Sequence, residues 1–166
     1  MRMPDLPAGV RPARPDDVPA VLRMIVDLAR YERAEDEVVA TESGLSDALF
    51  GTDAVAFALV AESDSEIVGI ALAYRTFSTW VGRPGLHLED LFVVPDARGT
   101  GRGEALLSAL ARITDANDWG RLEWDCLDWN TPSIGFYENL GAERVGGWIS
   151  YRVTGSTLRD LAVRAD

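Results

Sequence analysis

The sequence predicts an α/β fold built on a mixed β-sheet, and three observations lead to it. Apolar residues recur at helical spacing in some stretches and form short runs typical of strands in others. Two of these runs, Val55–Ala61 and Ile67–Tyr74, flank the polar turn Glu62–Glu66 and therefore predict a hairpin. The predicted elements follow the order β-α-α-β-β-β-α-β-α-β, which is typical of helices packed on a sheet.

The first half of the chain begins with a predicted short strand over Val10–Ala13. A helix follows, because a Pro-Asp-Asp start at residue 15 precedes apolar residues at helical spacing, namely Val18, Val21, Leu22, Ile25 and Leu28. The acidic stretch Tyr31–Val39 is expected to be a loop or a short turn. Thr41 is predicted to cap a second helix, which Gly51 ends.

The second half of the chain is expected to alternate strands and helices. A helix is predicted over Gly103–Asn117. Another begins at Thr131, because the proline that follows is favourable in a first helical turn, and Gly141 ends it. Three further strands are predicted, over Leu86–Val94, Leu122–Leu127 and Trp148–Val153.

Length and composition limit the number of domains and the cellular location that we expect for this protein. The chain has 166 residues, of which 47% are hydrophobic, so we expect one domain over residues 1–166 with a real core. No apolar stretch reaches the length of a membrane span, and the N-terminus lacks the apolar segment of a secretory signal. The single cysteine, Cys126, excludes an internal disulfide. We therefore expect a cytoplasmic protein without a membrane partner.

The net charge of the chain indicates which classes of binding partner to expect. A net charge of −11 argues against nucleic acid, whose binding requires Lys and Arg to neutralise phosphates. It favours a cationic partner, although acidic charge more commonly serves solubility. With one His and one Cys, no metal site is expected.

A glycine-rich stretch, Arg98–Gly103, lies between a predicted strand and a predicted helix. The amides at a helix start attract anions, and glycine lets a bulky phosphate approach the backbone. The stretch lacks the Gly-Lys-Ser/Thr of a Walker A loop, and its G-x-G-x-G spacing differs from the Rossmann fingerprint. Taken alone, it is either a phosphate-binding loop or a glycine-rich turn without a ligand.

Several segments together carry a resemblance to one family. They are Arg98-x-x-Gly101-x-Gly103, the strand Leu88–Val93 before it, Asn130–Tyr137 after it, and Leu28–Glu32 and Thr41-Glu42 near the N-terminus. The pattern resembles the GNAT superfamily of N-acetyltransferases over about the whole chain, and in particular its diamine (spermidine/spermine) and thialysine acetyltransferases. The resemblance implies a GNAT-like domain with a mostly antiparallel sheet flanked by helices, a Gly-rich strand–loop–helix site for acetyl-CoA, and a homodimer.

The resemblance also implies which residues bind acetyl-CoA. The backbone of the strand before the loop would pair with the pantetheine arm, while the same residues can equally be an ordinary core strand. The loop amides would wrap the pyrophosphate, with charge-assisted contacts from the two arginines. The implied set is Leu91, Phe92, Val93, Arg98, Gly99, Thr100, Gly101, Arg102, Gly103, Glu104, Asn130, Pro132, Ser133 and Tyr137.

Acetyl transfer from a thioester to an amine requires a base for the amine proton and an acid for the departing thiolate. An alkylammonium is only about one part in 10³ neutral at pH 7. The resemblance gives the role of base to Glu89 and that of acid to Tyr137, the alternatives being a solvent-facing carboxylate and a core aromatic. Asp90, expected on the opposite strand face, is a weaker candidate base, and His87 either assists proton removal or is structural.

A long cationic amine is expected to lie along a groove lined by carboxylates. By resemblance the substrate-binding residues are Tyr31, Glu32, Glu89, Glu123, Trp124 and Asp125. The acidic run that contains Glu32 can also be a solvated surface. Two departures from the family concern the amine pocket: the stretch before Trp148 is short and lacks acidic residues, and the turn Glu62–Glu66 is abbreviated.

The residues and the resemblance together predict an N-acetyltransferase that moves an acetyl group from acetyl-CoA to a primary amine of a small cationic substrate, either a polyamine or diamine or a lysine-like molecule. One alternative is a GNAT acetyltransferase for another amine, such as an amino acid, an antibiotic or a protein N-terminus. The other is a non-catalytic acetyl-CoA-binding sensor. The presence of both Glu89 and Tyr137 speaks for the enzyme.

Overall fold

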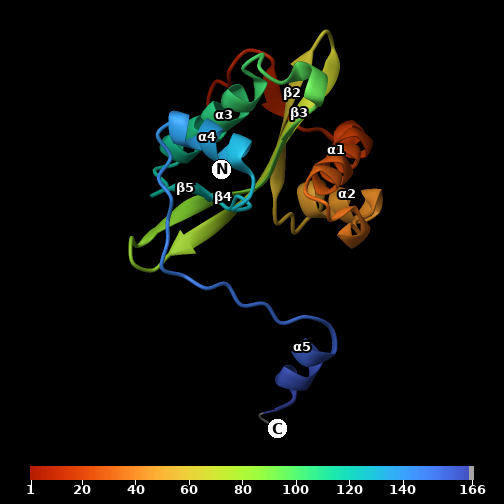
Figure 1. Ribbon diagram of the computed structural model, residues 1–166, viewed down its shortest axis with the longest axis vertical. Helices are drawn as coiled ribbons and strands as arrows, with labels where there is room; N and C mark the ends of the chain where they lie inside the picture. Colours follow the sequence, from red (N-terminus) through yellow and green to blue (C-terminus); the bar gives the residue numbers. More distant parts are fainter. Residues whose placement is uncertain (165–166) are drawn as a thin grey trace. The chain divides into compact units, whose positions relative to one another are not determined.

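The computed structural model describes residues 1–164 of the chain (Figure 1). The chain divides into two compact units, Met1–Asp125 and Cys126–Asp166. The first unit holds the sheet and helices α1 to α3, and the second holds helices α4 and α5. That residues 1–166 act as a single domain stays a prediction.

A five-stranded sheet forms the centre of the first unit. Neighbouring strands from β1 to β4 run antiparallel, and β5 runs parallel to β4. The strands lie side by side in sequence order: β1 (Val10–Pro12), β2 (Phe57–Ser63), β3 (Glu66–Ser78), β4 (Arg83–Val93) and β5 (Leu122–Trp124). The predicted α/β class with a mixed, mostly antiparallel sheet is confirmed.

Helices cover both faces of the sheet. α1 (Val18–Tyr31) and α2 (Glu42–Phe50) lie on one face, and α3 (Arg102–Ala116) lies on the other (Figure 1). The Thr41 side chain accepts a hydrogen bond from the N–H of Gly44 at 3.1 Å, which confirms the predicted cap of α2. Three short 3-10 turns complete the unit: Pro15–Asp17, Glu35–Glu37 and Pro95–Ala97.

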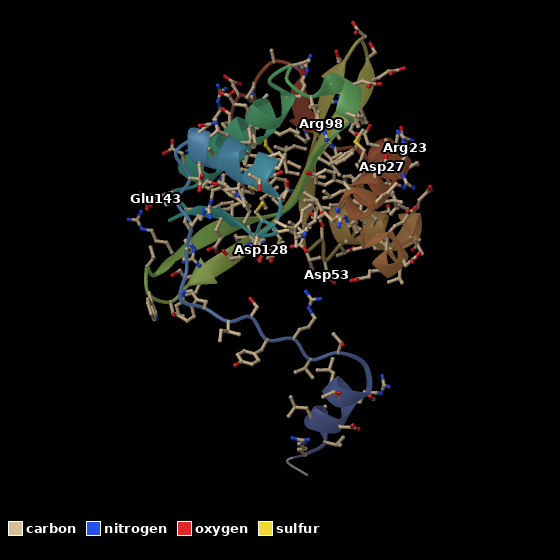
Figure 2. All side chains as sticks on the ribbon, viewed as in Figure 1. Arg23, Asp27, Asp53, Arg98, Asp128 and Glu143 are labelled. Atoms are coloured by element: carbon tan, nitrogen blue, oxygen red, sulfur yellow. The ribbon has the colours of Figure 1, made fainter. Side chains whose placement is uncertain are left out.

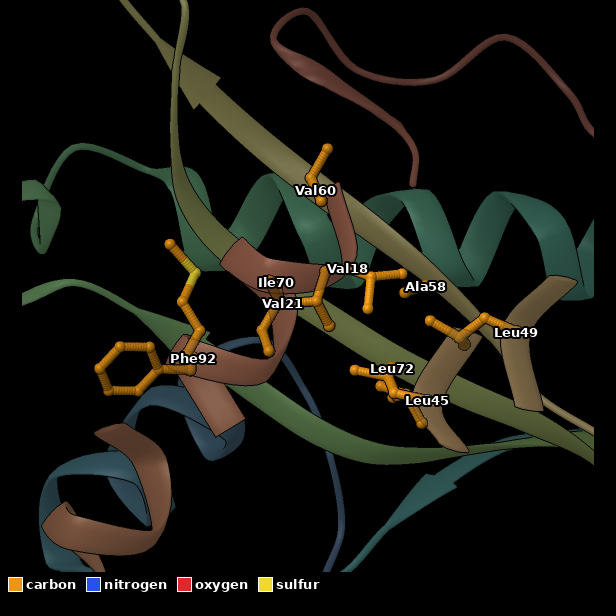
Figure 3. Packing of buried hydrophobic residues seen from close by; sticks show 10 residues of the cluster. Val18, Val21, Leu45, Leu49, Ala58, Val60, Ile70, Leu72 and Phe92 are labelled. Atoms are coloured by element: carbon orange, nitrogen blue, oxygen red, sulfur yellow. The ribbon is translucent and has the colours of Figure 1, made fainter. Parts of the chain in front are cut away.

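The main hydrophobic core lies between the sheet and helices α1 and α2 (Figure 3). Its buried side chains come from alternate strand positions and from one side of each helix: Val18, Val21, Met24, Leu45, Leu49, Ala58, Val60, Ile70, Leu72 and Phe92. Each large aliphatic residue among them contributes about 1.5–3 kcal/mol by its burial. This packing fixes the end of α1 against β4, where the candidate site lies.

Strand β4 carries one irregularity that shapes the site. Leu72 of β3 faces Asp90 of β4, and the next residue of β3, Ala73, faces Leu88. Glu89 therefore has no residue opposite it on β3, which defines a β-bulge. Side chains along β4 therefore do not alternate regularly between the two faces of the sheet at Glu89. The prediction that Glu89 and Asp90 lie on opposite faces assumed a regular alternation that the bulge interrupts.

Strands β3 and β4 extend further than the apolar pattern predicted. They form a long hairpin that pairs as far as Ser78 and Arg83, beyond the predicted ends at Tyr74 and Leu86. Two strands that satisfy each other's backbone groups can continue past the last apolar residue, because the ladder does not depend on side-chain hydrophobicity. The opposite error occurs in β5, which ends at Trp124, so Cys126 lies beyond the strand that was expected to contain it.

The second unit contains α4 (Thr131–Asn139), which begins at the predicted residue, and Gly141 follows its end with a φ of 86°. The predicted strand Trp148–Val153 is wrong. Its residues are exposed without regular secondary structure, and helix α5 (Gly155–Ala162) follows them. The segment has strand propensity, but no backbone in residues 1–164 pairs with it. None of the helices in that range is long and apolar enough to cross a membrane.

Candidate active site

The start of α3 is shaped by two glycines. Gly99 and Gly101 have φ angles of 74° and 81°, a left-handed conformation that glycine adopts without strain. A Cβ built on either would meet no atom of the described chain within 4 Å, so the backbone there faces open space. The Thr100 hydroxyl, between them, donates a hydrogen bond to the carbonyl of Ala97 at 2.6 Å. Since no side chain in residues 1–164 caps α3, its first N–H groups can receive an anion.

Arg98 connects this loop to β4 and to α1. Its Nε donates a hydrogen bond to the carbonyl of Val93 at 3.0 Å. Its guanidinium carbon lies 5.3 Å from the ring centre of Tyr31 and 5.6 Å from that of Phe92, within cation–π range. Figure 2 labels Arg98 on the ribbon between the sheet and α1. Tyr31 is thereby held beside the loop.

The two charged residues in the first turn of α3 have different surroundings. Arg102 is half-buried and its guanidinium lies beside Gly9, where an added Cβ would overlap it. Glu104 is exposed at the positive end of the helix, where a carboxylate is favourable. The backbone from Gly99 to Gly103 is therefore placed to receive an anion, while the Arg102 guanidinium is directed toward Gly9.

The strand before the loop has one open edge. β5 pairs with β4 only at Leu86, His87 and Leu88. Within the described chain, Leu91, Phe92 and Val93 therefore have β3 as their only strand neighbour. An extended ligand arm could add to this edge by the same hydrogen bonds that join strands.

Glu89 stands on the bulge with its side chain 55% exposed. One of its carboxylate oxygens, Oε2, lies 3.9 Å from Nε2 of His87. His87 pairs with Tyr74 across β3 and β4, and the two ring centres are 4.9 Å apart. The bulge thus brings Glu89 to the same end of the sheet as His87 and Tyr74.

Asp90 lies on the core side of the bulge. It pairs with Leu72, which belongs to the core against α1 and α2. Burial, together with the smaller effect of the charges of Glu89 and Glu32, raises the pKa of Asp90 to about 6. No cation in residues 1–164 forms an ion pair with it. Asp90 is therefore a carboxyl group that titrates close to neutral pH.

Electrostatic coupling shows that further carboxylates gather here. Burial raises the pKa of Glu32 at the end of α1. Burial and then the charges of Glu89, Asp125 and Glu123 raise the pKa of the Tyr74 phenol. Glu89 and Asp90 adjoin at the bulge, and Glu123 is in register with His87 beside them. Together with Glu32 and Asp125, whose charges act on Asp90 and Tyr74, they are called the acidic cluster.

Strand β5 sends its two candidate residues to opposite faces. Glu123 is in register with His87 and Trp124 is in register with Leu88, so their side chains alternate. Glu123 also forms an ion pair with Arg121, Nη2 to Oε1, at 2.9 Å. The structure therefore brings Glu123 to the acidic cluster and places Trp124 on the other face of the sheet.

The remaining candidates lie on α4 in the second unit. Asn130 is buried and caps the helix, since its Oδ1 accepts a hydrogen bond from the N–H of Ser133 at 3.3 Å, and Pro132 occupies the first turn. Tyr137 is half-buried, and its ring centre lies 5.3 Å from that of Phe136. The roles of these residues toward acetyl-CoA stay predictions.

Sequence reasoning missed part of this arrangement. It did not find Tyr74, and it ranked Asp90 low because it assumed an unbroken pleat. One signal for the bulge was present: Glu89 and Asp90 are adjacent acidic residues inside an apolar strand, where strict alternation would send one of them into the core. The described residues contain no group of three or more His, Cys, Asp or Glu side chains that could hold a metal ion.

Comparison with known proteins identifies the protein family to which this chain belongs. Residues 22–142 match the model of the Acetyltransferase (GNAT) family, and the chain belongs to that family. An integron cassette protein from the mobile metagenome of V. cholerae superposes with a TM-score of 0.76 at 25% identity, over 93% of this chain and 96% of that chain. The recognition of a GNAT fold from the sequence is confirmed.

Among the curated relatives, one is named as an acetyltransferase and another as an acetyltransferase-like protein. The chain is 35% identical over 164 residues to the thialysine N-epsilon-acetyltransferase of Sus scrofa, which covers 92% of this chain and 96% of the relative. It is 30% identical over 163 residues to spermidine/spermine N(1)-acetyltransferase-like protein 1 of Homo sapiens, with 92% of this chain and 23% of that protein covered. The protein is thus an enzyme that transfers acetyl groups.

Proposed function

We propose that this enzyme acetylates a primary amine of a small cationic substrate, either a diamine or polyamine or a lysine-like molecule, with acetyl-CoA as the acetyl donor. The acidic cluster at the bulge of β4 carries this proposal, because its carboxylates would attract and hold a cation. The net charge of −11 and the thialysine enzyme among the relatives support the same substrate class.

The open start of α3 fits the pyrophosphate of acetyl-CoA. The left-handed glycines leave unfilled the space that a Cβ would take at Gly99 and Gly101, and the α3 amides are available beside it. The unpaired edge of β4 at Leu91, Phe92 and Val93 would accept the pantetheine arm. Asn130, Pro132 and Ser133 at the start of α4 are proposed to complete the cofactor contacts, on the family resemblance.

The chemistry then divides between two side chains. The donor supplies the acetyl group as a thioester. Glu89 would accept the amine proton, which frees the nitrogen lone pair to attack the thioester carbon. Tyr137 would protonate the departing thiolate, a transfer from a phenol of pKa about 10 to a thiol of about 8.5 that is uphill by roughly 2 kcal/mol. Tyr31, Glu32, Glu123 and Asp125 are proposed to position the amine, whereas the substrate contact of Trp124, which lies on the other face of the sheet, rests on the family resemblance alone.

A cytoplasmic homodimer completes the proposal. The lone Cys126 suits a reducing compartment, since it forms no internal disulfide. Three large apolar side chains in the second unit, Trp148, Ile149 and Tyr151, are 75%, 78% and 90% exposed, which favours contact with a partner. Sedimentation of the purified protein would show a mass of two chains if this is correct and of one chain if it is not.

Thiol release from acetyl-CoA with a panel of amines tests the substrate class. The panel contains spermidine, putrescine, lysine, thialysine and a peptide with a free N-terminus. We expect release with the diamines and polyamines or with the lysine-like amines, at a kcat/KM far above that of the peptide. Release with the peptide alone would point to a protein amine instead. Silence with the whole panel, while calorimetry shows that acetyl-CoA binds, would favour the sensor.

A further inference from the structure

His87 is the only histidine of the chain, and it lies beside two members of the acidic cluster, Glu89 and Glu123. Its ring lies against Tyr74 of β3, its Nε2 lies 3.9 Å from Glu89 on the bulge, and it is in register with Glu123 of β5. Its side chain is 17% exposed, whereas that of Glu89 is 55% exposed. The imidazole is therefore mostly buried beside Tyr74, whereas the Glu89 carboxylate near it is more exposed.

A proton removed by Glu89 must leave before the next turnover. If the amine and the acetyl group bind over the bulge, as the proposed role of Glu89 requires, Glu89 loses much of its present contact with solvent. His87 lies two residues before Glu89 on β4, and its side chain is not fully buried. Imidazole is the side chain whose ordinary pKa is nearest to neutral, so it can both accept and release a proton at physiological pH.

We propose that His87 receives the proton that Glu89 takes from the amine and passes it to solvent. This inference rests on the proposed role of Glu89. First, an N–H bond of the ammonium breaks and an O–H bond forms on Glu89. Next, that O–H bond breaks as an N–H bond forms on neutral His87 Nε2, which restores the carboxylate. The imidazolium then releases a proton to water, and no other reactant is consumed.

Charged and aromatic side chains face His87 from β3, β4 and β5. Glu89 faces it from β4 and Glu123 from β5, with Arg121 paired to Glu123, while Tyr74 faces it from β3. Asp90 is next to Glu89 on β4, and the charge of Glu32, at the end of α1, acts on Asp90. The aromatic ring of Tyr74 lies beside the imidazole, with the two ring centres 4.9 Å apart, and limits its orientation. His87 thus acts through Glu89 as a positioning and relay residue.

Two substitutions separate a proton relay from a structural role. His87→Phe keeps a ring against Tyr74 but cannot carry a proton, and His87→Ala leaves space that free imidazole can enter. We expect each variant to lower kcat at pH 7 by about 10- to 100-fold, less than the 10²–10⁴-fold typical of a group that meets the reacting proton directly. Added imidazole should restore turnover of His87→Ala in proportion to the concentration of its neutral form. His87→Phe should gain activity as the pH or the buffer concentration rises.

Wild-type turnover in His87→Phe would overturn the proposal, because a ring without a proton site would then suffice. Failure of imidazole to restore His87→Ala would also overturn it. Glu89→Gln, assayed in parallel, separates the two proposals. If Glu89→Gln is inactive and His87→Phe is not impaired, only the relay is wrong. If Glu89→Gln keeps full turnover, the role of Glu89 fails and the relay fails with it.

Discussion

Two groups of ionisable side chains in the first unit are built in opposite ways. At the corner between β1 and α1, Arg11 lies 2.6 Å from Asp17 and 2.7 Å from Glu62. A hydrogen bond from Arg11, helped by one from the N–H of Arg14, lowers the pKa of Asp17. At the bulge of β4, burial beside other carboxylates instead raises the pKa of Asp90 to about 6.

The ionised side chains at the corner stabilise the folded state, whereas ionisation of Asp90 in the acidic cluster destabilises it. The corner satisfies each charge, so its ionisation favours the folded state. The acidic cluster leaves Asp90 and Glu32 without a cation among the described residues, and ionisation of Asp90 opposes folding. Strongly perturbed carboxyl groups of this kind concentrate at functional sites. The contrast can be tested by removing charges from each group in turn.

The largest effect is expected for Glu89→Gln. The amide keeps the size of the side chain but cannot accept the amine proton, so kcat should fall by roughly 10²–10⁴-fold. Because Glu89 is exposed on the bulge, the melting temperature should change little. Steady-state rates and a thermal melt check both parts. Loss of activity together with loss of folding would show that Glu89 is structural.

Asp17→Asn is the counterpart at the corner and should act on stability alone. The carboxylate accepts hydrogen bonds from the Arg11 guanidinium at 2.6 and 3.1 Å and from Arg14 N–H at 2.7 Å. Its loss should lower the free energy of unfolding at pH 7 by roughly 2–4 kcal/mol. Because the pKa of Asp17 is lowered by folding, this contribution is present above its unfolded pKa and disappears as the pH falls through the folded pKa. Urea unfolding at pH 7 and pH 3 measures it, and equal losses at both pH values would contradict it.

Asp90→Asn should have the opposite sign. The pKa of Asp90 is raised by folding, so wild-type stability is lost as the pH rises from about 4 through about 6. Asparagine resembles the protonated form at every pH, and the variant should be more stable than wild type at pH 7.5 by up to about 3 kcal/mol. At pH 4 the two should coincide. Thermal melts across this range provide the test. A variant less stable than wild type at pH 7.5 would show that other interactions in the folded protein stabilise the Asp90 carboxylate.

Salt should produce the smallest effect. Raising the ionic strength to about 1 M shortens the Debye length to about 3 Å, which weakens attraction of a cationic amine to the exposed carboxylates. The KM for the amine should rise several-fold, while the partly buried corner should keep its contribution to stability. Initial rates at several salt concentrations check this. A KM independent of salt would mean that the substrate is not held by charge.

The parts of the molecule that follow from local patterns were predictable. Thr41 caps α2 and Gly141 ends α4 because each satisfies a local backbone requirement. The glycine loop could be placed before a helix for the same reason. The adjacent carboxylates of Glu89 and Asp90 indicate an irregular strand, but the exact position of the bulge could not be derived, because it depends on the register of β4 against β3. The strand expected at Trp148–Val153 failed for a related reason, since a strand needs a partner that its own sequence does not specify.

The bulge also has a consequence for how this enzyme can change over generations. Glu89 fills no place in the ladder and none in the hydrophobic core, so another side chain there need not shift Leu88 or Asp90. Its chemistry and the folding of β4 can therefore be selected separately. A lineage could therefore lose or regain the proposed base at this position without compensating mutations in the core, whereas a change at Asp90 would alter charge and core packing at once.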